Sequence, residues 1–169
     1  LFANVWVFVG HESQTPKHGD YFTTQIGSQP VIQVRHSDSK IKVLHNRCPH
    51  KGTKIAIDRH GNTGTFFRCP YHAWSFETDG RLKAVPLESG YSNTSFETTE
   101  NANGIKPVGA VHNHRGFVFA RLADSGISFD DFFGDSLSSI DNMVDRSPEG
   151  RLEVAGPPLR YMHKCNLCM

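Results

Sequence analysis

Two short loops, each with one cysteine and one histidine, constrain this chain more than any other feature. One stretch reads NRCPHKG and places Cys48 and His50 two positions apart; another reads RCPYHAW and places Cys69 and His72 three positions apart. A proline follows each cysteine, so neither stretch fits the interior of a helix. Thiolate and imidazole are both metal ligands, and we therefore expect the fold to bring these four side chains together.

The sequence around the loops is typical of an all-β domain. Alternating apolar and polar positions, rich in β-branched and aromatic residues, recur as far as residue 122 and are separated by turn formers. Asp79 and Gly80 form a strong turn signal between two of these segments. We expect strands over residues 5–10, 21–26, 31–35, 41–45, 65–68, 74–77, 81–84, 105–111 and 116–122.

The residues after 122 break this pattern. Apolar side chains such as Phe129, Leu137 and Ile140 recur at helical spacing and predict one helix over about 129–145, which Ser128 would cap. Residues 151–154 and 159–162 resemble strands without a partner. The predicted fold class is therefore mainly β, with antiparallel sheets and one α-helix on the C-terminal side.

Charge and hydropathy exclude several classes of function. The 169 residues contain 18 Lys and Arg and 17 Asp and Glu, a net charge of +1, so we expect no nucleic-acid partner. No apolar run approaches the roughly 20 residues that span a bilayer, and we expect no membrane partner. Four cysteines in such a chain suggest metal ligands or free thiols in the cytoplasm. The sequence starts without methionine and ends abruptly, which suggests a piece of a longer protein.

Two kinds of metal site accept two thiolates and two imidazoles: a single tetrahedral zinc ion, or an iron–sulfur cluster with mixed ligands. Common zinc sites pair like with like within a loop, as in Cys-x2-Cys and His-x3-His. Here each loop supplies one ligand of each kind. This suits two metal atoms, one bound by both thiolates and the other by both imidazoles, which is the Rieske pattern.

The stretches CPHKG and CPYHAW resemble the cluster loops of Rieske proteins, specifically the Rieske [2Fe-2S] domain in the large (alpha) subunit of aromatic-ring-hydroxylating oxygenases. The resemblance extends over residues 1–122, through VGHESQ and GDY before the loops and GRLKAVP after them. It implies a barrel-like antiparallel base with a cluster-binding subdomain at about 45–86. Residues 123–169 would lead into a catalytic domain absent from this chain.

The resemblance also implies which residues hold the [2Fe-2S] cluster. Cys48 and Cys69 would bind an inner iron as thiolates, and His50 and His72 would bind the outer, redox-active iron. Four more residues are expected around the cluster: Lys51, Gly52, Tyr71 and Trp74. The family usually has arginine where this chain has Lys51, so the charge is kept but the planar fork is lost.

Respiratory Rieske proteins differ from this chain at informative positions. They carry one further cysteine in each loop, joined as a disulfide, where this chain has Thr53 and Tyr71. They also direct a serine and a tyrosine hydroxyl toward the cluster, where this chain has Trp74 and Phe76. Because hydroxyl donors make reduction easier, their loss predicts a potential in the low part of the roughly −150 to +300 mV Rieske range.

The implied function is one-electron transfer to the mononuclear non-haem Fe(II) of a ring-hydroxylating dioxygenase or monooxygenase that acts on an aromatic compound. A ferredoxin or flavin reductase would supply the electrons, and the catalytic domain of the same or a neighbouring subunit, in a homo-oligomer such as a trimer, would accept them. His112 and His114 are too close in sequence to form the two-His-one-carboxylate site, so no catalytic residue is assigned in this chain. The alternatives are a free-standing Rieske ferredoxin and, more remotely, a zinc-stabilised structural β module.

Overall fold

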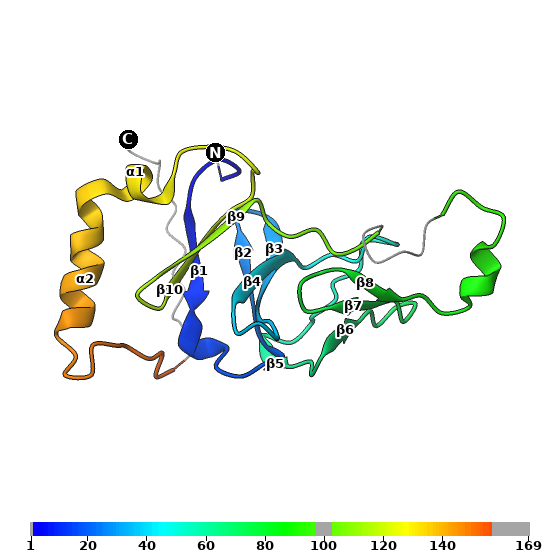
Figure 1. The fold of residues 1–169 in the computed structure, drawn as a ribbon, viewed down its shortest axis with the longest axis horizontal. Helices are drawn as coiled ribbons and strands as arrows, with labels where there is room; N and C mark the ends of the chain where they lie inside the picture. The colour runs from blue at the N-terminus through cyan, green and yellow to red at the C-terminus, as the bar shows by residue number, and fades with distance from the viewer. Residues whose placement is uncertain (1, 97–102, 157–169) are drawn as a thin grey trace.

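Three antiparallel sheets make up the computed structural model, which describes residues 2–96 and 103–156. Along the long axis of the molecule, the first sheet lies next to the α-helices within residues 129–145, the third sheet lies on the other side of the second, and the segment after the third sheet, with a short helix at residues 88–91, extends beyond it (Figure 1). The first sheet has the order β1 (Val7–His11), β10 (Phe117–Arg121), β9 (Ala110–His114). The second has the order β4 (Ile41–His45), β3 (Gln29–Arg35), β2 (Asp20–Ile26), β5 (His60–Asn62). The third has the order β6 (Phe66–Arg68), β7 (Ser75–Glu77), β8 (Leu82–Ala84).

The first two sheets share one apolar cluster. Val9 and Val118 of the first sheet are buried together with Val31 and Val43 of the second. Burial of each such side chain contributes roughly 1.5–3 kcal/mol to folding. The alternating pattern of the sequence thus becomes the two inner faces of a sandwich.

A second apolar cluster joins the second sheet to the small third sheet. It contains Ile32 and Leu44 from the second sheet together with Phe67 and Phe76 from the third. Both cysteines of the two loops belong to the same cluster. The loops therefore stand on a packed foundation that spans two sheets.

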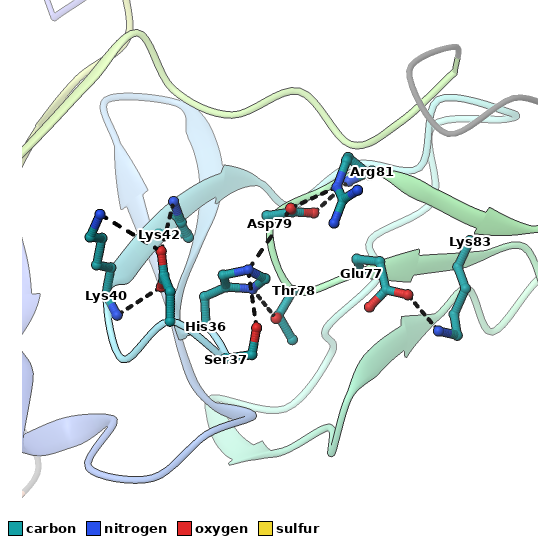
Figure 2. Close-up of polar contacts among 10 residues, drawn as sticks. His36, Ser37, Lys40, Lys42, Glu77, Thr78, Asp79, Arg81 and Lys83 are labelled. Carbon is teal, nitrogen blue, oxygen red and sulfur yellow. Dashed lines mark hydrogen bonds and ion pairs between the residues drawn. The ribbon is translucent and has the colours of Figure 1, made fainter.

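A polar junction fixes the third sheet to the turn between β3 and β4 (Figure 2). His36 Nδ1 lies 2.6 Å from Oγ1 of Thr78, which is 1% exposed. Asp79 lies 3.9 Å from His36 Nε2 and accepts a 2.8 Å hydrogen bond from Arg81 Nε. Gly80 completes the predicted turn with φ 98°, and a Cβ there would lie 2.4 Å from the carbonyl oxygen of Ile105. Only glycine fits this close approach.

The predicted helical segment extends over the expected residues, 129–145. It consists of α1 (Phe129–Phe133), a 3-10 turn η3 (Gly134–Ser136) and α2 (Leu137–Asp145). Ser128 caps its start, because Ser128 Oγ accepts a hydrogen bond from Asp131 N at 3.1 Å. The turn that separates the two helices was not predicted. It follows from Gly134, whose φ of 48° departs from helical geometry.

The predicted mainly β fold with antiparallel sheets is confirmed, and most strands lie within two residues of their expected ends. Three details differ. Residues 60–62, for which no strand was expected, form β5, which pairs with β2. The expected strand over 105–111 is replaced by a single bridge at Pro107 followed by β9. Residues 151–154 form no strand, and Val154 N donates instead to Ser13 Oγ at 3.0 Å. The expected strand 159–162 lies outside the described residues.

Two short 3-10 helices, η1 (Glu12–Gln14) and η2 (Glu88–Tyr91), complete the elements. Within residues 2–96 and 103–156, no helix is both long enough and apolar enough to span a bilayer.

Candidate metal centre

The two Cys/His loops start from different sheets. The first follows β4 of the second sheet, and the second connects β6 to β7 in the third sheet. Because the two sheets share the apolar cluster that contains Cys48 and Cys69, the loops come together although 20 residues separate the cysteines in the sequence.

The backbones of the two loops have the same hydrogen-bond pattern. Cys48 N donates to the carbonyl oxygen five residues later, that of Thr53, at 2.8 Å, and Cys69 N donates likewise to Trp74 O at 2.8 Å. The residue four positions after each cysteine donates back to the cysteine carbonyl, and both of these residues have positive φ: Gly52 at 76° and Ala73 at 57°. The loops are therefore two copies of one turn, with histidine at the third position in one and at the fourth in the other.

Asn46 closes the base of the first loop. Its Oδ1 accepts hydrogen bonds from Ile55 N at 2.9 Å and Ala56 N at 3.0 Å, and its Nδ2 donates to Ala56 O at 2.7 Å. The side chain is 3% exposed. Sequence reasoning assigned no role to Asn46, because its partners lie nine and ten residues away and no local pattern marks them.

The two thiols lie inside the protein and contact each other. Cys48 and Cys69 each expose 2% of their surface. Burial raises the pKa of the Cys48 thiol, and so does its hydrogen bond with the Cys69 thiol, whereas the backbone amides of His50 and Lys51 lower that pKa. The thiol therefore keeps its proton until a metal ion displaces it.

The two imidazoles lie nearer the surface and also face each other. The ring centroids of His50 and His72 are 4.6 Å apart. Burial lowers the pKa of His50, and the neighbouring His72 and Lys51 lower it further, which favours the neutral, metal-binding imidazole.

An aromatic ring of the second loop contacts each imidazole. The Trp74 indole lies parallel to the His50 ring, with 3° between the planes and 4.7 Å between the centroids. The Tyr71 ring lies against His72, with 3.8 Å between the centroids and a tilt of 34° between the planes. Trp74 is buried and Tyr71 is 63% exposed, so the indole joins the rings to the core and the phenol stands at the surface.

The donor set therefore fits two metal atoms with different ligands. Each loop contributes one thiol and one imidazole, yet the fold pairs thiol with thiol inside and imidazole with imidazole outside. A two-iron cluster needs this separation of the ligand types.

Comparison with known proteins agrees with this geometry. The profile of the Rieske [2Fe-2S] domain matches residues 5–98. The chain belongs to the Rieske [2Fe-2S] family. The Rieske cluster is the cofactor of this family, and both loops lie within the matched residues.

The Rieske proteins most similar to this chain include oxygenase subunits. The alpha subunit of toluate 1,2-dioxygenase from Pseudomonas putida is 36% identical over 168 residues, which are 98% of this chain and 36% of that subunit. Naphthalene 1,2-dioxygenase from a Rhodococcus species superposes with a TM-score of 0.83 at 32% identity, over 94% of this chain and 35% of its own. The structure of a quaternary ammonium Rieske monooxygenase gives a TM-score of 0.75 at 27% identity, over 86% of this chain and 38% of its own. The chain thus spans about a third of the length of the relatives it matches.

His112 and His114 serve the fold. They lie on the same face of β9, since residues two apart in a strand point the same way. The His112 ring stacks on Phe129 at 3.8 Å, and His114 Nε2 lies 2.8 Å from an Asp141 carboxylate oxygen. Both histidines therefore attach the helical segment to the first sheet.

Proposed function

We propose that this chain transfers single electrons through a Rieske [2Fe-2S] cluster held by Cys48, His50, Cys69 and His72. One observation carries the proposal: the fold pairs the two thiols in the interior and the two imidazoles toward the surface. When bound, such a cluster accepts and releases one electron at a time. The stacked indole of Trp74 would hold the His50 ring in orientation and exclude water from its inner face.

We further propose that the potential is low. Trp74 and Phe76 are buried at 2% and 0% exposure, at the positions where high-potential relatives have hydroxyl donors. Neither side chain can donate a hydroxyl hydrogen bond to a sulfide, so added negative charge would be less stabilised. We expect a midpoint potential below zero; a positive midpoint would contradict the assignment.

The proposed place of the chain is the electron-relay part of an oxygenase alpha subunit. The names of the relatives and the chain's share of their length support this. The acceptor would be a mononuclear non-haem Fe(II) in a catalytic domain beyond these residues, in the same or a neighbouring subunit of a trimer. The structure of the quaternary ammonium Rieske monooxygenase gives insights into inter-subunit electron transfer in that enzyme, which favours the neighbouring subunit as the acceptor here.

The same comparisons support a class of substrate, whereas the proposed donor rests on the resemblance of the loops alone. Toluate and naphthalene dioxygenases favour an aromatic substrate, and a ferredoxin or flavin reductase is the proposed donor.

We also propose that residues 1–122 form the Rieske domain and that residues 123–169 form a following segment. The pairing of β1 with β10 supports it, because that pairing places residues 117–121 in the same sheet as 7–11. The cytoplasmic location stays a prediction.

The test is spectroscopic. The purified full-length protein should be red-brown, contain iron and acid-labile sulfide, and give in the reduced state the electron paramagnetic resonance signal of mixed His and Cys ligands. Cys69→Ser and His72→Ala should each abolish that signal, while the matched variant His45→Ala, which changes a histidine outside the two pairs, should keep it. A colourless, zinc-loaded protein would refute the proposal and favour the structural zinc module. A protein whose only iron is the cluster would favour a free-standing ferredoxin.

A further inference from the structure

Positive charge is concentrated in the segment of sequence that contains the first Cys/His loop, although the whole chain is nearly neutral. Seven of the 18 Lys and Arg residues fall between Asp38 and Glu77, against one of the 17 Asp and Glu residues, Asp58. Net charge alone conceals this asymmetry. The stretch includes the loop from Cys48 to Gly52.

Two of these seven cations, Arg47 and Lys51, line a cavity beside the first loop, and Lys106 from a later segment of the chain lines it as well. The cavity has a volume of about 620 Å³ and is lined by Arg47, Lys51 and Lys106 together with Cys48 and His50. No Asp or Glu occurs among its lining residues as far as the structure describes them. Within residues 2–96 and 103–156, none of the three cations forms an ion pair with a carboxylate. We call this cavity the basic hollow.

The charges of the basic hollow lie beside two histidines. His50 and Lys51 line the cavity side by side. Lys106 lowers the pKa of His45, after the larger effect of burial. The hollow is therefore a region of positive potential that extends to the ring proposed to bind the outer iron.

We propose that the basic hollow is the docking site of a protein electron donor with a carboxylate-rich surface. The inference rests on the proposed function and specifies the chemistry of the partner. A donor must approach the outer histidine pair, and His50 forms part of the wall of the hollow. Cations that line a concave surface attract carboxylates, speed association and fix the orientation of a partner. The exposed ring of Tyr71, which lies against His72, offers an aromatic contact beyond the hollow.

The first experiment measures binding. A fluorescein-labelled poly-L-glutamate peptide should bind the full-length protein at low ionic strength, and binding should weaken near 0.15 M salt, where the Debye length is about 8 Å. The double variant Lys51→Glu/Lys106→Glu should raise the dissociation constant by roughly tenfold or more.

The control is the double variant Lys17→Glu/Lys40→Glu, which has the same net charge. These two lysines lie at the end of the second sheet away from the loops. Lys40 precedes the start of β4, whereas the first Cys/His loop follows its end. Lys17 lies near Gly19, whose backbone amide donates to Arg35 O at the same end of the sheet. The control should leave the dissociation constant within about twofold of wild type.

The second experiment measures electron transfer with two small oxidants of opposite charge. One electron passes from the reduced protein to cobalt(III), which becomes cobalt(II), and no proton moves. In the Lys51→Glu/Lys106→Glu variant, oxidation by the anionic cobalt(III)–EDTA complex should slow by roughly tenfold, and oxidation by the cationic tris(phenanthroline)cobalt(III) complex should become faster. A changed potential or a damaged fold would move both rates in the same direction.

Four results would overturn the inference. In the binding experiment they are equal effects of the two double variants, or tighter binding of duplex DNA than of poly-L-glutamate at equal charge. The others are parallel changes in the two oxidation rates, and a changed oligomeric state in the Lys51→Glu/Lys106→Glu variant. The last would show that the hollow joins copies of this chain. Absence of the Rieske resonance signal would instead refute the proposed function, and the binding experiment would still be informative about the hollow.

Discussion

Replacement of Asn46 should loosen the first Cys/His loop more than its small size suggests. In Asn46→Ala, three backbone groups lose their partner: the amides of Ile55 and Ala56 and the carbonyl of Ala56. A buried polar group without a partner costs about 1–3 kcal/mol. The low end of this range for each of the three groups gives an expected loss of about 3 kcal/mol in the free energy of unfolding. In a chain of this size the loss lowers Tm by about 6–12 °C.

Asn46→Asp separates the individual contacts. A carboxylate keeps both acceptor bonds but cannot donate to Ala56 O, whereas a protonated carboxyl can. The stability difference between this variant and wild type should therefore shrink as the pH falls through the pKa of the new carboxyl group. Both variants should also bind less iron, because the loop places Cys48 and His50.

Urea denaturation followed by tryptophan fluorescence measures the stability, and colorimetric assay measures iron per chain. The control is Asn62→Ala, which removes an exposed side chain that bonds His18 O and Asp20 Oδ1, and it should cost less than about 1 kcal/mol. If Asn46→Ala costs no more than Asn62→Ala, the three hydrogen bonds do not close the loop and the reasoning is wrong.

Three more predictions follow from single contacts, and urea denaturation measures each of them. Ala73→Gly should stabilise the protein by about 0.5–1 kcal/mol, and Gly52→Ala should destabilise it by a similar amount. Positive φ costs a non-glycine residue about 1–2 kcal/mol, and the greater freedom of glycine in the unfolded chain offsets about 0.4–1 kcal/mol of that difference. A change of the same sign in both variants would contradict the equivalence of the two loops. Burial lowers the pKa of His11, whose Nε2 has no hydrogen-bond partner in the described structure. The free energy of unfolding should therefore fall by up to about 1.4 kcal/mol per pH unit as the pH drops below 6.5. His11→Asn, which keeps the cap of the 3-10 helix η1, should reduce that slope. Thr78→Val should cost about 1 kcal/mol through the lost contact with His36 shown in Figure 2, whereas Ser37→Ala at the exposed side of the same ring should cost less than about 0.5 kcal/mol.

Local sequence determined the elements of this protein that depend on neighbouring residues. The two Cys/His loops, the Asp79–Gly80 turn, the Ser128 cap and most strands could be predicted because each is set by residues a few positions apart. The same loops were sufficient to indicate the family. Strand β5 could not be predicted, since its three residues have no strand pattern and form a strand only by pairing with β2.

Only the tertiary structure decided how the site is assembled. The sequence predicted that thiol pairs with thiol and imidazole with imidazole, but the two loops meet in this arrangement only because two sheets share the apolar cluster that contains both cysteines. The fold also brings Lys106, from a distant segment, to the same cavity as Lys51, which the overall charge of +1 conceals. Asn46 acquires its role in the same way. Contacts between segments far apart in the chain depend on the packing of whole sheets, and no local pattern of residues specifies them.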